Sequence, residues 1–202
     1  MRCDITETAK ILKRMEVPDW ALDKTLLTYD VNLNNDGSVV EDIRRATDSR
    51  RNIGIICKQS GRGKTHLAVG ALGRACWSHR GNAWDYLFTR ADSAIRRIET
   101  AGIRLDEVME HYTDREALVL DEVGRGFERG EYSKAVFQML VGEAYDKGVH
   151  LIWTSPFEWL ELKGLIDGAT ISRLEGRGTG LIIQLREGKR YKISQPDEVK
   201  LF

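Results

Sequence analysis

The 202-residue sequence has few cysteines and no net charge, with 31 lysines and arginines against 31 aspartates and glutamates. Its three cysteines, Cys3, Cys57 and Cys76, do not have the spacing of metal ligands. We interpret them as reduced thiols of a cytoplasmic protein, since Cys57 and Cys76 fall in a predicted strand and a predicted helix. The balanced charge excludes an arm held on nucleic acid by bulk charge alone, although local basic patches remain compatible with it.

The sequence also lacks a long apolar run, an internal repeat and a low-complexity segment. A helix needs about 18 apolar residues in a row to span a bilayer, and no run approaches that length. The first residues, Met1 to Glu7, contain no apolar stretch of the kind that a secretory signal requires. We therefore expect a soluble cytoplasmic protein without a membrane partner, whose 42% of apolar residues suffice for one α/β core.

Strand-like and helix-like segments alternate along the chain. Short apolar runs predict strands at 53–57, 83–88, 117–120, 149–153 and 180–185, with 190–193 pairing with the last of them. Apolar residues at helical spacing predict helices at 5–17, 38–48, 66–72, 91–100, 104–112, 132–147 and 157–166. Strands separated by helices indicate a parallel sheet with helices on both faces.

A glycine turn ending in Gly63-Lys64-Thr65 stands between the first predicted strand and the next helix. This is the context that a phosphate-binding P-loop requires. The N–H groups of such a turn point at an anion, Lys64 reaches the terminal phosphates, and the Thr65 hydroxyl ligates Mg²⁺. The motif predicts ATP and Mg²⁺ as ligands. The predicted nucleotide-binding residues are Ser60, Gly61, Arg62, Gly63, Lys64, Thr65 and His66.

The loop departs from the P-loop consensus at Lys58, where the consensus has its first glycine. The alternative interpretation is a basic glycine turn that binds nothing. A second motif weighs against it, because the apolar run 117–120 ends in Asp121-Glu122, the pattern called Walker B. At the carboxyl end of a core strand, Asp121 would hold the Mg²⁺ and Glu122 would deprotonate the attacking water. The alternative for this pair is a solvated acidic loop.

The two motifs together resemble those of the AAA+ ATPases of the DnaC/IstB clade, which are replicative helicase loaders and transposition helpers. The resemblance runs from about Val17 to Tyr191, and its most specific stretches are Gly63-Lys64-Thr65-His66-Leu67-Ala68 and Asp121-Glu122-Val123-Gly124. It implies a three-layer P-loop NTPase of the ASCE type, with a central parallel sheet and little or no C-terminal helical lid. It also divides the chain into an N-terminal arm and lead-in segment, 1–50, and an ATPase core, 51–202.

The resemblance implies roles for residues outside these motifs. Arg173 takes the place of the arginine finger, which a neighbouring subunit points at the γ-phosphate, and the fold implies a ring or spiral oligomer. The alternative for Arg173 is a solvated helix arginine. Thr154-Ser155 would end the fourth strand as sensor 1, and we include Ser155 among the catalytic residues. The family's usual asparagine is replaced here by Pro156, which leaves slow hydrolysis as an open alternative.

Four arginines on or beside the helix after the second strand are the candidates for DNA contact, because family members place DNA-facing elements there. A solvated face is the alternative. The four are Arg90, Arg96, Arg97 and Arg104. The nearby Trp84, Tyr86 and Phe88 alternate along the predicted strand, so we expect them in the core and not on a stacking surface.

The expected function is that of an ATP-dependent loader of a replicative DNA helicase, of a phage or mobile-element type. ATP binding would assemble subunits on DNA, with single-stranded DNA favoured, and hydrolysis would release them. Two alternatives stay open. One is an IstB-like transposition helper that recruits a transposase to duplex DNA, and the other is a nucleotide-gated scaffold or inhibitor with little turnover.

Overall fold

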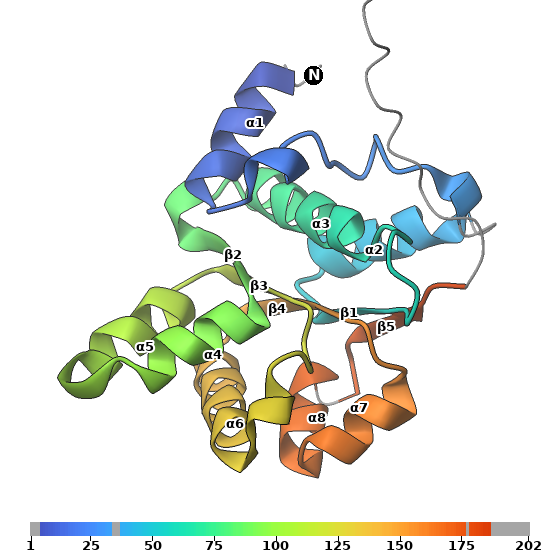
Figure 1. Cartoon of the computed structure of the whole chain (residues 1–202). Helices are drawn as coiled ribbons and strands as arrows, with labels where there is room; N and C mark the ends of the chain where they lie inside the picture. The colour runs from blue at the N-terminus through green and yellow to red at the C-terminus, as the bar shows by residue number, and fades with distance from the viewer. Residues whose placement is uncertain (1–4, 34–36, 177, 187–202) are drawn as a thin grey trace, which may run out of the picture.

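The computed structural model describes residues 5–33, 37–176 and 178–186. Its centre is a sheet of five parallel strands in the order β2-β3-β4-β1-β5. Figure 1 shows the sheet as a middle layer with helices above and below it. This confirms the predicted parallel sheet. The strands are β1 (Ile53–Ile56), β2 (Tyr86–Arg90), β3 (Ala117–Asp121), β4 (His150–Ser155) and β5 (Leu181–Gln184).

Two hydrophobic clusters hold the three layers together, one on each face of the sheet. The first lies under α1 (Ile5–Arg14), α2 (Ser38–Asp48) and α3 (Lys64–Ser78). The second lies under α4 (Ala91–Glu99), α5 (Leu105–Thr113), α6 (Glu131–Asp146), α7 (Trp159–Leu165) and α8 (Gly168–Leu174). Every helix among the described residues is too short or too polar to cross a bilayer.

Short 3-10 turns connect several of these elements. They are η1 (Asp19–Ala21), η2 (Val31–Leu33), η3 (Ala83–Asp85), η4 (Gly102–Arg104) and η5 (Phe127–Arg129). The turn η3 corrects one sequence prediction, because the strand expected at 83–88 begins only at Tyr86 and runs on to Arg90. Tyr86 and Phe88 are buried as expected, whereas Trp84 lies in the turn and is 59% exposed. The Asn82 side chain accepts the Trp84 N–H and so caps this turn.

The continuous apolar runs of β3 and β4 are buried along their whole length, as runs of this kind are in central parallel strands. β4 lies between β1 and β3, although it comes after both in the chain. The carboxyl end of β4 therefore lies between the glycine turn that follows β1 and the acidic pair that ends β3. This insertion places Thr154 and Ser155 in the middle of the predicted site.

The N-terminal segment packs on the sheet. Leu12 of α1 and Met15 in the turn after it are buried in the same cluster as α3. The Phe88 N–H of the edge strand β2 donates to the Met15 carbonyl at 2.8 Å. This contact covers part of an edge that would otherwise offer unpaired backbone groups. The domain boundary near residue 50 stays a prediction.

The last described strand, β5, pairs with β1 in parallel, with Leu181 opposite Ile53. Sequence reasoning expected it to pair with the segment 190–193. That segment lies outside the described residues.

Gly54 in β1 is closely packed in the core and carries a testable prediction. A Cβ at this position would lie 2.3 Å from Trp153 Cζ2 and 2.8 Å from Ile182 Cδ1. We expect Gly54→Ala to lower the free energy of unfolding by about 1–3 kcal/mol, the usual cost of overpacking a core. Chemical denaturation measures it. The control is Gly164→Ala in α7, where no described atom lies within 4 Å of the new Cβ. Equal losses in the two variants would contradict the packing argument.

Candidate nucleotide-binding site

The turn between β1 and α3 has the backbone shape of a phosphate-binding loop. Gly61 and Gly63 have φ angles of 74° and 84°, in the left-handed region that favours glycine. Gly63 is the N-cap of α3, so no side chain caps the first N–H groups of this helix. The first turn of α3 carries no acidic residue either. These N–H groups and the positive end of the helix dipole are therefore available to an anion.

Lys64 lies across the start of this loop. Its Nζ donates to the Cys57 carbonyl at 2.8 Å and to the Gln59 carbonyl at 3.2 Å. Burial lowers the pKa of Lys64, and the nearby carboxylates of Asp121 and Glu122 oppose that shift. An ammonium group held by two neutral carbonyls can exchange them for phosphate oxygens, to which it makes stronger, charge-assisted hydrogen bonds.

Asp121 joins the ends of β1, β3 and β4. Thr65 Oγ1 donates to its two carboxylate oxygens at 3.0 and 3.2 Å, and Thr154 Oγ1 donates to Oδ1 at 2.7 Å. Burial raises the pKa of Asp121, while the hydrogen bonds from Thr154 and Thr65 lower it. The carboxylate and the Thr65 hydroxyl are oxygen ligands of the kind that Mg²⁺ prefers.

A nucleotide would have to complete that coordination shell. Among the described residues, no group of three or more histidines, cysteines, aspartates or glutamates could hold a metal by itself. Mg²⁺ is usually bound by one or two protein oxygens together with substrate phosphates, and the pair Thr65 and Asp121 fits that pattern. The residues present are therefore compatible with Mg²⁺ bound together with a nucleoside triphosphate.

Glu122 has a strained backbone and an engaged carboxylate. Its φ is 60°, rare for a residue with a side chain, and its N–H donates to Thr154 Oγ1 at 2.9 Å. Arg90 Nη2 lies 3.0 Å from one carboxylate oxygen, and Arg125 Nε lies 3.3 Å from the other. Strained residues of this kind gather at functional sites, where surrounding contacts hold them in place. In this state the predicted base is neutralised by two arginines.

The four arginines expected to contact DNA are all exposed, and two of them, Arg90 and Arg96, line one cleft. Arg90 reaches back to Glu122, and Arg96 lines the same cleft of about 400 Å³ together with Arg125, Pro156 and Phe157. Arg97 on α4 and Arg104 on η4 are exposed. Arg90 thus contacts the predicted catalytic carboxylate, and DNA contact by any of the four stays a prediction.

Of the two hydroxyls at the end of β4, Thr154 faces Asp121. Ser155 is fully buried, its Oγ donates to the Val123 carbonyl at 2.8 Å, and it accepts the Phe157 N–H at 3.1 Å. A hydroxyl held by two backbone groups is poorly placed to reach a phosphate. The catalytic role expected of Ser155 stays a prediction, and the hydroxyl that contacts the predicted acidic pair is that of Thr154.

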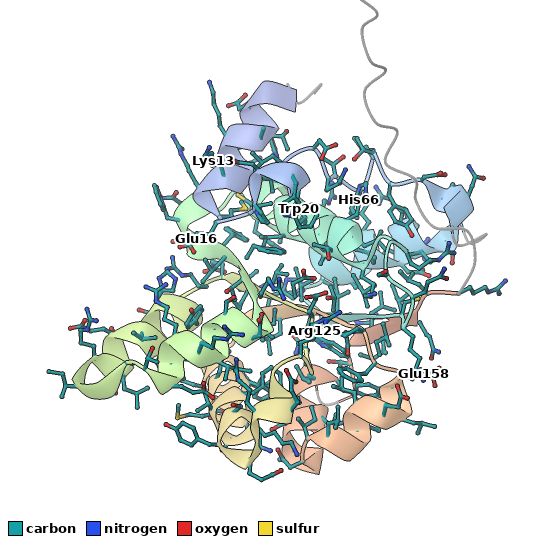
Figure 2. The ribbon with its side chains drawn as sticks, viewed as in Figure 1. Lys13, Glu16, Trp20, His66, Arg125 and Glu158 are labelled. Carbon is teal, nitrogen blue, oxygen red and sulfur yellow. The ribbon has the colours of Figure 1, made fainter. Side chains whose placement is uncertain are left out.

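Lys58, the departure from the loop consensus, forms ion pairs outside the loop. Its Nζ lies 2.7 Å from Glu161 Oε1 and 3.6 Å from Glu158 Oε1. Both glutamates belong to the capping box at the start of α7. Figure 2 shows Glu158 at the outer edge of the molecule. The side chain of Lys58 is thus drawn away from the phosphate position, so this lysine does not occupy the anion site.

Two other predicted nucleotide-binding residues, Arg62 in the loop and His66 in α3, have side chains that pack against the protein. The Arg62 side chain is buried and its Nε donates to the Arg186 carbonyl at 2.9 Å, which ties the loop to the end of β5. His66 Nε2 lies 2.9 Å from the Thr25 carbonyl, and burial lowers the pKa of His66, so the ring is neutral at pH 7. Any contribution of Arg62 and His66 to nucleotide binding therefore comes from their backbone.

Arg173 lies away from these groups within the same chain. Its carbonyl accepts a hydrogen bond from Asn52 Nδ2 at 2.9 Å. Asn52 precedes β1, whereas the loop follows β1, so the Arg173 backbone lies at the opposite end of that strand. The guanidinium lies near Gly142 of α6. Arg173 therefore does not complete its own chain's site, and its role as a finger in a neighbour stays a prediction.

Sequence reasoning missed Tyr29 and Arg125 as members of the site. The Tyr29 hydroxyl donates to the Arg62 carbonyl at 3.4 Å, and its ring lies where a Cβ on Gly63 would meet it at 2.5 Å. The His66 ring meets it edge to face at 5.3 Å. Tyr29 lies outside the P-loop and Walker B motifs, so neither motif pointed to it. Sequence reasoning missed Arg125 because its contact with Glu122 depends on the turn that follows β3.

The chain has the fold of the P-loop NTPases, and the comparisons with known structures agree on this fold. The structure is similar to that of the DnaC helicase loader, with a TM-score of 0.68 and 15% identity over 84% of this chain and 100% of that one. It is similar to DnaI, with a TM-score of 0.65 and 16% identity over 87% of this chain and 94% of that one.

A third similar structure is AMPPCP-bound DnaA from Aquifex aeolicus, with a TM-score of 0.61 and 23% identity over 80% of this chain. The present chain spans about half of that DnaA, 49% of its length. No family model and no curated protein sequence matches the chain. At these identities the likenesses establish the fold, and they confirm the predicted three-layer architecture.

The Thr154 hydroxyl supports the buried Asp121, and its removal should destabilise the protein. Thr154→Val keeps the shape but removes the donor to Asp121 and the acceptor of the Glu122 N–H. We expect the free energy of unfolding to fall by about 1–3 kcal/mol, the cost of leaving a buried polar group unsatisfied. Chemical denaturation at pH 7 measures it. Thr154→Ser is the control and should retain most of the stability. An unchanged unfolding midpoint for Thr154→Val would show that the hydroxyl does not support Asp121.

Proposed function

We propose that this protein is an ATP-dependent loader of a replicative DNA helicase, of a phage or mobile-element type. The observation that carries the proposal is the joining of Thr65, Asp121 and Thr154 beside an uncapped helix N-terminus. This arrangement occurs in a chain with the fold of the DnaC helicase loader and of DnaI. A similar DnaA structure contains both AMPPCP and single-stranded DNA. These likenesses support DNA and a helicase as the partners.

Each residue of the site has a distinct task in this proposal. The loop N–H groups and Lys64 bind the β- and γ-phosphates, while Thr65 and Asp121 hold the cation. Bound Mg²⁺·ATP supplies the transferable phosphoryl group and the charge that draws these groups together. Glu122 accepts a proton from the attacking water once Arg90 and Arg125 release its carboxylate. Thr154 fixes the positions of Asp121 and Glu122 relative to each other.

The engaged state of Glu122 and the proline at position 156 favour slow turnover in the isolated chain. Assembly on DNA would then depend mainly on ATP binding, with hydrolysis as the slower releasing step. The same observations support the second candidate, a nucleotide-gated scaffold or inhibitor. An IstB-like helper on duplex DNA shares the site chemistry, so DNA strandedness and the identity of the protein partner separate it from a loader.

Two substitutions test nucleotide binding and hydrolysis separately. Lys64→Ala removes the side-chain cation placed for the phosphates, so ATP binding should be lost in calorimetry. Glu122→Gln keeps the shape of the site but removes the base. Its ATP affinity should survive, while the hydrolysis rate falls by about 10²–10⁴-fold, the usual contribution of a general base.

The matched control is Lys58→Ala, which removes a lysine of the same loop whose ammonium is paired with Glu161. ATP binding should persist in that variant. If Lys64→Ala binds ATP as tightly as Lys58→Ala does, the P-loop assignment is wrong. If Glu122→Gln hydrolyses ATP at the unaltered rate, the base lies elsewhere while nucleotide binding stands.

The proposed ring or spiral predicts that Arg173 acts in a neighbouring subunit. Arg173→Ala should bind ATP but hydrolyse it more slowly by about 10³–10⁵-fold, as arginine fingers contribute in related phosphoryl transfers. In a mixture with Lys64→Ala, the Arg173→Ala subunit binds ATP and receives the intact Arg173 of its neighbour. Part of the activity should therefore return, and its recovery should rise with total protein concentration.

The control for this mixture is Lys64→Ala combined with the Lys64→Ala/Arg173→Ala double variant, which contains no intact pair and should stay inactive. Analytical ultracentrifugation shows whether the variants assemble. If Arg173→Ala and Lys64→Ala assemble together but no activity returns at any concentration, Arg173 does not act across a subunit boundary.

A further inference from the structure

A shallow groove of about 380 Å³ lies between α1 and the turn η3, apart from the nucleotide site. It is lined by Lys10, Lys13, Arg14 and Glu16 of the N-terminal segment and by Trp84. Trp84 stands at the amino end of β2, whereas the phosphate loop follows the carboxyl end of β1 in the same parallel sheet. The groove therefore opens away from the end of the sheet that would hold ATP.

The Trp84 side chain is exposed, whereas its backbone is held by hydrogen bonds. Its N–H donates to Asn82 Oδ1 at 3.3 Å, and its carbonyl accepts a hydrogen bond from Arg115 Nη1. Arg115 is itself held by the His111 carbonyl at 2.8 Å. The indole is nevertheless 59% exposed. A rigid, half-exposed indole can stack on a planar partner at little cost in conformational entropy.

The rim of the groove is positively charged. The buried side of α1 is anchored by Leu12 and Met15, which leaves Lys10, Lys13 and Arg14 exposed. Lys13 pairs with Asp19 at 3.3 Å, and no described residue forms an ion pair with Lys10 or Arg14. The carboxylate on the rim, Glu16, lies 3.6 Å from His111 Nε2. Figure 2 shows Lys13 on α1 and Glu16 below it, both on the outer side of the molecule.

From these contacts we infer that the groove between α1 and Trp84 binds single-stranded nucleic acid. Trp84 would stack on an unpaired base, and Lys10, Lys13 and Arg14 would contact the adjacent phosphates. This pairing of an aromatic platform with a row of cations is the chemistry that binds single strands without reading their sequence. A duplex keeps its bases stacked inside and would gain only the phosphate contacts. The inference extends the proposed function, since it gives the loader a DNA surface distinct from the arginines of α4.

Fluorescence anisotropy with a labelled oligothymidylate of about 16 nucleotides, the upper site size of one single-strand binding module, tests this inference. Trp84→Ala should weaken binding by about tenfold, within the range of one lost base stack. Trp84→Phe should restore most of the affinity. The triple variant Lys10→Ala/Lys13→Ala/Arg14→Ala should lower the slope of log affinity against log salt by about two units.

The matched control is Tyr132→Ala on α6, an aromatic residue that is 68% exposed and lies on the other face of the sheet. It should leave the affinity unchanged. Photocrosslinking with a bromodeoxyuridine oligonucleotide, followed by peptide mapping, should place the adduct on Trp84. This direct readout does not depend on any substitution, so a variant that folds poorly cannot mimic the result.

Three results would overturn the inference. The first is unchanged affinity in both Trp84→Ala and the triple variant. If Arg96→Ala/Arg97→Ala alone weakens binding, the proposed function stands and the groove has no part in it. The second is an affinity for duplex DNA equal to that for the single-stranded oligonucleotide. The third is binding of an acidic peptide, but not of the oligonucleotide, in a manner that requires Trp84. ATP binding, measured separately on the same proteins, shows whether the nucleotide-binding part of the proposed function fails as well.

Discussion

The buried carboxylate of Asp121 is the constraint on which the rest of the site depends. A carboxylate removed from water is stable only when its oxygens are hydrogen-bonded, and Thr65 and Thr154 supply those bonds from two other elements. Meeting this requirement fixes the start of α3 and the ends of β3 and β4 relative to one another. The phosphate loop, the acidic pair and the fourth strand are thereby held in one geometry before any ligand arrives, which is the preorganisation that binding sites need.

Glu122 illustrates how the same geometry can hold activity in check. Its left-handed backbone places the side chain between Arg90, at the end of β2, and Arg125, in the turn after β3. Both carboxylate oxygens are thereby engaged by guanidinium groups. Glu122 could act as a base only after these contacts change, which is the behaviour that the proposed slow turnover requires.

The N-terminal segment contacts both the nucleotide site and the opposite end of the sheet. Tyr29 and Thr25 contact the loop through Arg62, Gly63 and His66, while α1 covers the edge strand β2 beside Trp84. A single continuous segment thus touches both the region that would hold ATP and the groove that we assign to nucleic acid. The packing of Leu12 and Met15 in the same hydrophobic cluster as α3 holds this segment against the body of the protein.

Sequence patterns alone were enough to predict the strand, glycine turn and helix around Lys64, the acidic pair after β3 and the parallel sheet. Each of these rests on local patterns: apolar runs, helical spacing, and glycines where a positive φ is needed. It also placed Tyr86 and Phe88 in the core but misjudged Trp84, because a 3-10 turn and a strand start share the same short apolar pattern.

Three features of the site could be known only from the folded chain. β4 lies between β1 and β3, Thr154 and not Ser155 faces Asp121, and Arg90 and Arg125 converge on Glu122. The contacts of Thr154 with Asp121 and of Arg90 with Glu122 join residues that are far apart in the chain. The contact of Arg125 with Glu122 depends on the path of a single turn. Local propensity carries no information about such contacts, because strand order and side-chain packing determine them.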